Sequence, residues 1–441
     1  MTTNVSRRTF LMGASLGVGA TLAGCSAPVL SGLSVRSAPS GALDYWNLFG
    51  GGDGVRMNQM LDRFRVLNPA IELDAVTLAW GNPYYTKLSL ATLGQKPPDV
   101  AISHLTRMKT LVAADLLEEL RLEDLARFGI TPDKLDRTAW ETGLVNGKAY
   151  AIPLDTHPFV MFYNTDVCRQ AGLLDSDGRL VPLDGEDKFI DAMRRAKQVT
   201  GRYGGVIAIN NDTSTNWRVF QSLYSQLGGR MLADEGRRVV IDEPKAIEVL
   251  SFLRSWTADG LFPPAADYQG AIAAFAEGQS GFYFQGEWEI STFQTAKMPF
   301  SMTPFPNIYG GDQYAVQADS HTLVIPKQPR DDRERLDRSL TLIKSLLEQS
   351  RTWAEGGHVP AWLPFRESAE YQSMTPQSYY AAAAEAAAYD PQAWYSGSGS
   401  IFEIITGSAI AGVLGLRQSP AGAVAQMRAG LSELADTAPP V

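Results

Sequence analysis

Apolar and polar positions from residue 43 onward alternate between strand-like and helix-like spacing. Residues 55–67 carry apolar side chains at 57, 60, 61, 64 and 67, which is one face of a helix, and Asn68-Pro69 ends it. We predict further elements of both kinds in turn: strands at 43–49, 71–76 and 99–102, and helices at 84–93 and 107–120. This β-α-β-α order predicts an α/β fold with mostly parallel sheets flanked by helices.

A second run of the same kind begins after residue 160. We predict strands at 205–209, 281–285 and 314–326, and helices at 188–199, 216–227, 244–260, 269–277 and 336–349. The last part of the chain is predicted to be helical at 378–389, 401–416 and 421–435. Two such runs predict two lobes, and ligands of doubly wound sheets bind beyond the carboxyl ends of their strands.

The first residues of the chain follow another pattern. Arg7 and Arg8 precede an apolar run at 10–22, which ends in small residues. A charged start, a short apolar middle and a small-residue exit are typical of an export signal. The run is too short to cross about 30 Å of hydrocarbon. Residues 6–11, SRRTFL, resemble a twin-arginine export signal.

The end of this signal resembles a bacterial lipobox. Residues 22–25 read LAGC, which implies lipidation of Cys25. Residues 26–40 are rich in Ser, Ala, Gly and Pro, a composition typical of a flexible tether. We predict an export signal over 1–24 and a lipid-anchored tether over 25–42; the alternative is an ordinary cleaved signal with an accidental cysteine.

The composition excludes several classes of protein. A chain of 441 residues is too long for one core, and 45% apolar with 20% charged residues is typical of folded domains. Its net charge is −9 and falls to −11 without residues 1–24, so a nucleic-acid-binding role is not expected. Beyond Cys25 only Cys168 remains, which excludes a disulfide framework and predicts a lone buried thiol.

Three groups of short motifs resemble those of bacterial extracellular solute-binding proteins of the sugar-binding, maltose-binding-protein-like type. They occur in the family's order and extend over residues 43–435. The segments are NGKAYAIP (146–153), LDTHP (154–158) and FYNTD (162–166), then AFAEGQSGF (274–282) and GEW (286–288), then GGHVP (356–360) and PFRES (364–368).

The resemblance implies a two-lobed fold whose lobes close on a ligand by hinge motion. It implies crossings between the lobes near 153–159, 315–321 and 359–366. The lobes are then an N-terminal one of residues 43–155 plus 318–360, and a C-terminal one of residues 156–317 plus 361–441.

The resemblance also implies the function. It is that of a substrate-binding lipoprotein of an ABC importer, which captures a sugar or sugar derivative on the extracytoplasmic face of the cell membrane, works with a membrane permease and is a monomer. Gly281-Phe282 stands where the family has Ala-Met, and Ser103-His104 where the maltose-specific member has an aromatic residue, which weakens maltodextrin as the ligand. A glycerophosphodiester receptor of the same fold and an exported glycoside hydrolase are the alternatives.

A sugar site needs two kinds of side chain. Hydroxyl groups bind to charged and amide groups, and the C–H faces of the ring pack on flat aromatic rings. Such side chains lie in the predicted loops and crossings, although each has an alternative role in the core or as a cap. The candidates are Asn47, Trp80, Ser103, His104, Asp155, His157, Asn211, Asp212, Trp217, Glu287, Trp288, Asp319, Ser320, His321 and His358. Their four acids, Asp155, Asp212, Glu287 and Asp319, favour a neutral or cationic ligand such as an amino sugar.

Motifs for other chemistry are weak. The four histidines are far apart in the sequence and form no His-Glu-x-x-His motif, so we predict no metal site and no cofactor. The one Gly-x-Ser-x-Gly match, at 13–17, falls within the predicted signal. Residues 50–54, GGGDG, lack the spacing of a phosphate-binding or dinucleotide loop. Backbone N–H groups of this loop could still bind an anion, so a glycerophosphodiester remains an alternative ligand.

Overall fold

The computed structural model describes residues 41–311 and 314–438. The predicted signal, Cys25 and all of the predicted tether except Gly41 and Ala42 lie outside the described residues. Within the described residues, every helix is too short or too polar to cross a membrane.

The first sheet has five strands in the order β2-β1-β3-β14-β6. The pairs β1–β2 and β1–β3 are parallel, whereas β14 runs antiparallel to both of its neighbours. The strands are β1 (Leu43–Asn47), β2 (Leu73–Thr77), β3 (Val100–His104), β6 (Ile152–Pro153) and β14 (His321–Val324). A small hairpin, β4 (Leu144–Val145) with β5 (Lys148–Ala149), lies nearby in the sequence.

Amphipathic helices complete this first lobe. Helix α1 buries Met57, Met60, Leu61 and Phe64, four of the five positions of the predicted apolar face, whereas Leu67 at its end is exposed. The helices are α1 (Gly51–Leu67), α2 (Asn82–Leu93), α3 (Leu105–Ala113), α4 (Leu122–Arg127), α5 (Arg137–Thr142), α12 (Arg333–Glu348) and α13 (Ser350–Glu355).

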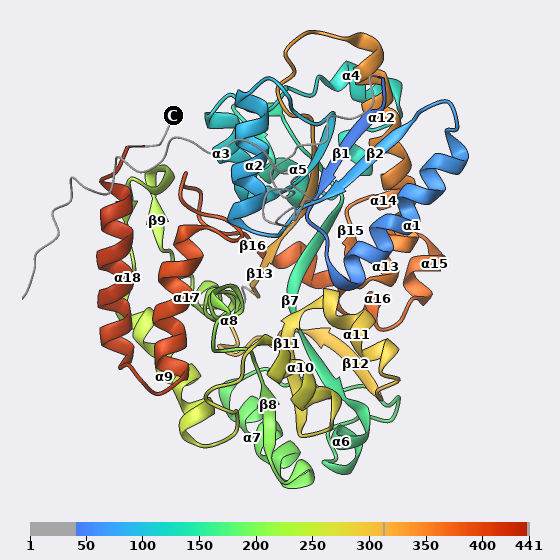
Figure 1. Ribbon diagram of the computed structural model, residues 1–441. Helices are drawn as coiled ribbons and strands as arrows, with labels where there is room; N and C mark the ends of the chain where they lie inside the picture. The colour runs from blue at the N-terminus through green and yellow to red at the C-terminus, as the bar shows by residue number, and fades with distance from the viewer. Residues whose placement is uncertain (1–40, 312–313, 439–441) are drawn as a thin grey trace, which may run out of the picture. The chain divides into compact units, whose positions relative to one another are not determined.

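The second sheet has seven strands built around one long strand, β7 (Asp155–Asn164). All ten residues of β7 are buried, and Figure 1 shows this strand running from the first sheet into the second. Strands β11, β12, β13 and β15 all pair with β7 in the antiparallel direction. The other strands are β8 (Tyr203–Val206), β11 (Ser280–Gly286), β12 (Phe300–Pro304), β13 (Val316–Asp319), β15 (Val359–Pro360) and β16 (Ala387–Ala388).

Helices cover this second sheet, and the two closing helices α17 and α18 pack on α8 and α9 (Figure 1). The helices are α6 (Thr165–Gln170), α7 (Glu186–Thr200), α8 (Thr213–Gln226), α9 (Glu243–Ala258), α10 (Tyr268–Ala276), α11 (Ile290–Thr295), α16 (Gln377–Tyr380), α17 (Ile401–Leu414) and α18 (Pro420–Ala435). The short helices α14 (Leu363–Arg366) and α15 (Ala369–Ser373) follow β15, and Phe365 of α14 packs against the core of the first lobe. The hairpin β9 (Leu232–Ala233) with β10 (Arg238–Val239) lies between α8 and α9 in the sequence.

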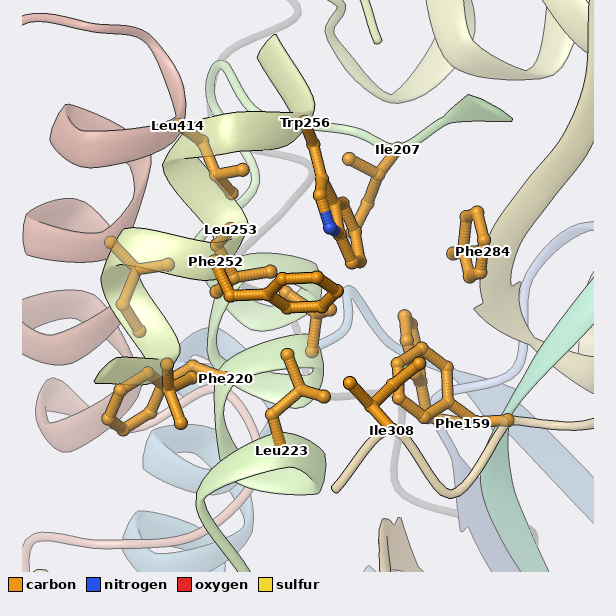
Figure 2. Close-up of a cluster of buried hydrophobic side chains, with 14 of the residues drawn as sticks. Phe159, Ile207, Phe220, Leu223, Phe252, Leu253, Trp256, Phe284, Ile308 and Leu414 are labelled. Carbon is orange, nitrogen blue, oxygen red and sulfur yellow. The ribbon is translucent and has the colours of Figure 1, made fainter. Parts of the chain in front are cut away.

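Each lobe has its own hydrophobic core. The core of the second lobe is rich in aromatic rings: Trp256 stacks on Phe262 and Phe189, and Phe284 packs beside it. Figure 2 shows part of this cluster, where Phe252 and Leu253 of α9 meet Phe220 and Leu223 of α8. Cys168 is a buried free thiol in the same core, as predicted. Burial raises its pKa to about 12.

The chain passes between the sheets at short connections. Leu154 is the one residue between β6 of the first sheet and β7 of the second, and Ser320 is the one residue between β13 and β14. A third segment, β15, follows α13 of the first lobe and pairs with the beginning of β7. Three segments from distant parts of the sequence therefore meet at the first residues of β7.

Several sequence predictions were wrong in detail, and one of them is the helix 107–120, where α3 ends at Ala113 and Leu117 forms a β-bridge with Pro326. The sheets are mixed rather than mostly parallel, because β14 in the first sheet and β7 in the second run antiparallel to neighbouring strands. The alanine-rich segment 378–389 is not one helix: it holds the end of α16, a 3-10 turn over Ala381–Ala386 and strand β16. Tertiary contacts override helix propensity here, because β16 pairs with β13 and the small side chains of Ala383 and Ala384 are buried.

Candidate functional site

A pocket of about 440 Å³ opens where the two sheets meet. Its lining comes from loops after β1, β2 and β3, from the connections beside β7 and β14, and from loops and helices after β8 and β11. The lining residues are Leu48, Phe49, Gly50, Asp53, Trp80, His104, His157, Asn211, Asp212, Ser214, Thr215, Arg218, Tyr268, Gln285, Trp288 and His321.

Trp288 is the aromatic wall contributed by the second lobe. Its indole lies over Gly286, where an added Cβ would come 1.8 Å from the ring, so only glycine leaves room for this fold-back. The indole N–H donates to the hydroxyl of Tyr268 at 2.9 Å. The Arg218 guanidinium lies 5.0 Å from the ring centroid, within the range of a cation–π contact. Trp288 is therefore fixed from several sides.

Trp80 is the aromatic wall contributed by the first lobe. It follows β2, and 46% of its surface is exposed. The edge of the imidazole of His104 lies against it, with 6.2 Å between the ring centroids. Because the indole is exposed beside a polar pocket, its apolar face is available to a ligand.

Polar groups of α8 and β11 form one side of the pocket. Asp212 caps α8 and accepts hydrogen bonds from the backbone N–H and the hydroxyl of Thr215, at 2.9 and 2.6 Å. Burial raises the pKa of Asp212. The amide of Gln285 donates to the Thr215 hydroxyl at 2.8 Å, and Arg218 donates to the side chain of Gln317 at 3.2 Å. These bonds hold the polar side of the pocket in one arrangement.

Three histidines line the pocket, and strand register brings two of them together. His321 of β14 lies opposite His104 of β3, and the centroids of their rings are 5.0 Å apart. The Tyr85 hydroxyl accepts the backbone N–H of His104 at 2.8 Å and shares a second hydrogen bond with Nδ1 of that ring at 2.7 Å. These two bonds fix the orientation of the imidazole. Burial lowers the pKa of His104 well below its usual value, so the ring is neutral.

Asp155 organises the other two histidines from below the pocket. It accepts hydrogen bonds from Nδ1 of His157 at 3.1 Å, from Nδ1 of His321 at 2.8 Å and from the indole N–H of Trp353 at 2.6 Å. With Nδ1 of His157 protonated in this hydrogen bond, Nε2 of that neutral ring is an acceptor. Burial lowers the pKa of His157 to about 3. The neighbouring imidazoles keep the pKa of Asp155 well below its usual value despite burial, so it stays ionised.

His358 lies deeper and faces three carboxylates. Its Nε2 is 3.0 Å from Asp53, and its Nδ1 is 3.1 Å from Glu287 and 3.4 Å from Asp155. Asp53 and Asp155 raise the pKa of His358 well above its usual value, against the effect of its burial. Burial raises the pKa of Glu287 to about 7. His358 therefore acts as a buried cation between acidic side chains.

Comparison with known proteins assigns the chain to a protein family. The model of a family described as bacterial extracellular solute-binding proteins matches residues 60–387, about three quarters of the chain. The chain belongs to the bacterial extracellular solute-binding protein family.

Relatives and solved structures agree with the family. A maltooligosaccharide ABC transporter solute-binding lipoprotein of Streptococcus pneumoniae is 23% identical over 295 residues, and the matched stretch covers 64% of each chain. The fold is also that of T. maritima MalE3 with maltose bound, at a TM-score of 0.75 and 19% identity over 89% of this chain and 99% of the other. UgpB of Mycobacterium tuberculosis in complex with glycerophosphocholine matches at 0.74 and 18% identity, over 90% and 99%.

Seven of the fifteen predicted ligand-binding residues of this solute-binding protein line the pocket. They come from both lobes and from the connections between them. They are Trp80, His104, His157, Asn211, Asp212, Trp288 and His321.

The other eight predicted residues lie outside the pocket lining and are almost fully buried: Asn47, Ser103, Asp155, Trp217, Glu287, Asp319, Ser320 and His358. Each polar group has neighbours within the protein. Trp217 donates its indole N–H to Asp390 at 2.8 Å. Asp319 accepts hydrogen bonds from Thr106 and from the backbone of Ser320. Three of the four acids proposed to favour a cationic ligand thus lie among these eight, leaving only Asp212.

Several pocket residues of the solute-binding protein were not predicted. Arg218 is next to the predicted Trp217, and the phase of α8 turns the tryptophan into the core and the arginine toward the pocket. Gln285 is the last residue of the predicted strand 281–285, so its position at a strand end was a usable signal. Tyr268 lies at the beginning of α10 and carried no such signal.

Proposed function

We propose that this protein binds a sugar in the pocket and delivers it to an ABC importer. The observation that carries the proposal is the pairing of two indoles, Trp80 and Trp288, one from each lobe, around three imidazoles. Flat rings match the C–H faces of a pyranose, and each indole supplies a large apolar area. The pneumococcal relative is named for maltooligosaccharide, which supports the same ligand class.

The three histidines suit hydroxyl groups. His157 offers an Nε2 lone pair because its Nδ1 is bonded to Asp155, and His321 is held to the same carboxylate through Nδ1. The neutral ring of His104 presents a donor or an acceptor according to its tautomer. A sugar hydroxyl both donates and accepts, so it can bond to either kind of imidazole, and adjacent hydroxyls can use both. Because these rings are held by Tyr85 and Asp155, they keep this pattern without reorganisation when the ligand arrives.

The charge of the pocket favours a neutral sugar. Arg218 is the one arginine or lysine among the described lining residues, and two carboxylates, Asp53 and Asp212, stand beside it in the lining. A phosphodiester would meet two acids for one guanidinium, so a glycerophosphodiester is the second candidate, supported by the structural likeness to UgpB. An amino sugar is less favoured than the sequence suggested, because only one of the four predicted acids lines the pocket.

Transport follows from hinge closure in this proposal. A ligand held between the lobes stabilises the closed arrangement, because only then do both indoles contact it. The permease of an ABC importer is the partner, Cys25 carries the lipid anchor outside the cytoplasm, and the protein acts as a monomer without covalent chemistry. Membership in a family of solute-binding proteins replaces the glycoside hydrolase alternative.

A thermal-shift screen tests the proposal. The purified protein is heated with neutral oligosaccharides, amino sugars and glycerophosphocholine, each in large excess. A ligand at about 100 times its dissociation constant stabilises the folded state by about 2.7 kcal/mol, which raises the melting temperature. A neutral sugar is expected to give the largest shift. A shift with glycerophosphocholine alone would replace the sugar, and release of free sugar from a glycoside would contradict a binding role.

A further inference from the structure

All four histidines of the chain meet at one place in the structure. His157 and His321 have ring centroids 4.3 Å apart, His104 and His321 5.0 Å, and His321 and His358 5.4 Å. They come from four different segments, so the fold rather than the sequence spacing gathers them. The sequence predicted no metal site because the histidines are dispersed, and the fold removes that reason.

Three of these histidines surround Asp155 with the same nitrogen. Nδ1 lies 3.1 Å from the carboxylate in His157, 2.8 Å in His321 and 3.4 Å in His358. These four residues have ligand atoms that all lie within 4.8 Å of one another, and all four are buried. Zinc bonds of about 2.0–2.2 Å to N and O in a tetrahedron place neighbouring ligand atoms about 3.3–3.6 Å apart. The Nδ1–carboxylate distances are near this spacing, and the wider separations, which lie within 4.8 Å, contract when the ion binds.

The same cluster holds polar atoms without hydrogen bonds. Both carboxylate oxygens of Glu287 and Nδ1 of His358 are buried, and none makes a hydrogen bond within the described part of the chain. Glu287 and His358 are 3.1 Å apart, but outside hydrogen-bonding geometry. Buried polar groups are almost always hydrogen-bonded or bound to an ion, so this group needs a partner.

Charge points the same way. His358 faces the carboxylates of Asp53, Asp155 and Glu287, two of which are fully buried. Three acidic side chains thus converge on one imidazole, whereas Arg218, the one arginine or lysine of the described pocket lining, lies against Trp288 and Gln317. A divalent ion would bring positive charge to these converging acids.

We propose that Asp155, His157, His321 and His358 bind one divalent ion of the zinc type, with Glu287 beside it. Each ring that binds the ion through Nδ1 keeps one proton on Nε2: in His157 and His321 that proton moves there from Nδ1, His358 releases its Nδ1 proton to solvent, and Asp155 stays an anion. The site is closed and links the first residues of β7 to β14 and β15, where the lobes join. With Nδ1 bound to the ion, Nε2 of His157 and His321 carries the proton and becomes a donor toward the pocket.

Cobalt(II) is the most direct probe, because its visible absorption reports a four-coordinate site. The full-length protein is freed of metal with a chelator and titrated with Co²⁺ and then Zn²⁺, and bound metal is counted by mass spectrometry. We expect one equivalent of Co²⁺, with visible bands that Zn²⁺ abolishes. Asp155→Asn and His358→Gln should each weaken binding about 100-fold or more. Asp319→Asn removes a buried carboxylate outside the cluster and should leave the affinity unchanged.

Counting the bound metal tests the metal site independently of the proposed sugar binding. If the folded wild-type protein takes up no Co²⁺ or Zn²⁺, the metal site is wrong, whatever the sugar screen shows. Binding that survives unchanged in both Asp155→Asn and His358→Gln would place the ion elsewhere and overturn it as well. If either variant fails to fold, the wild-type cobalt spectrum decides: six-coordinate weak bands contradict the proposed ligand set.

Discussion

The two indoles of the pocket are held in very different ways. Trp288 of the second lobe lies on Gly286, donates to Tyr268 and has Arg218 against its ring. Trp80 of the first lobe is 46% exposed and has the edge of His104 beside it. A ring that is fixed before binding loses little entropy when a sugar stacks on it, whereas a loosely held ring loses more. We infer from this difference that the second lobe provides the preformed half of the site, whereas the half provided by the first lobe adjusts when the lobes close.

The largest effect should come from Trp288→Ala. Loss of the preformed ring removes an apolar face at the centre of the pocket, and affinity for the sugar should fall by about 1–3 kcal/mol. Isothermal titration calorimetry measures it. Trp394→Phe, in a tryptophan that does not line the pocket, is the control and should leave affinity unchanged. Equal affinity in Trp288→Ala and wild type would remove the second lobe's ring from the site.

Gly286→Ala tests whether the fold-back of Trp288 matters. The new methyl group would lie 1.8 Å from the ring and must displace it, so affinity should fall by about tenfold, or 1.4 kcal/mol. A double-mutant cycle separates this cause from general damage. Gly286→Ala added to Trp288→Ala should cost nothing more, because both changes remove the same contact. Fully additive losses would show that Gly286 acts in another way.

Trp80→Ala should have a smaller effect than Trp288→Ala. The exposed ring pays more to become ordered, so the loss of affinity should be about 0.5–1 kcal/mol. Calorimetry on the two variants with one sugar gives the ratio directly. If Trp80→Ala bound the sugar with lower affinity than Trp288→Ala, the assignment of the preformed and adjustable halves would be reversed.

The buried cluster below the pocket predicts a pH effect on stability. Burial raises the folded-state pKa of Glu287 to about 7 from 4.5. Between these values the folded state holds a proton that the unfolded state has lost, so stability falls as pH rises through this window. Urea unfolding of metal-free protein at pH 5 and pH 8 should show this fall, and Glu287→Gln should reduce it. An equal fall in both proteins would assign it to other groups.

Much of the fold follows from local patterns. Residues 55–67 were predicted as a helix because their apolar positions share one face, and α1 buries that face except at Leu67. The predicted strand 281–285 is the centre of β11. Segment 378–389 could not be predicted in this way, because its alanines favour a helix while pairing with β13 and burial decide its structure. Long-range partners of this kind leave no trace in local spacing.

The pocket was predictable where a polar or aromatic residue follows a strand, as at Trp80, His104 and Trp288. The pocket was not predictable where the orientation of one side chain decides whether a residue lines the pocket or packs in the core. The phase of α8 separates Trp217 from Arg218, and a hydrogen bond to protein atoms holds Asp319 away from the lining. Asp155 was expected to contact the ligand, yet it binds His157 and His321 instead. Its proposed effect on the ligand is therefore indirect.

Calorimetric titration of the best neutral oligosaccharide from the screen, against the wild-type protein and the Trp80→Ala/Trp288→Ala double variant, tests the central proposal most directly. We predict saturable binding of one ligand per wild-type chain and a loss of about 2–4 kcal/mol in a folded double variant. Equal dissociation constants for the two proteins would contradict a sugar site between these rings.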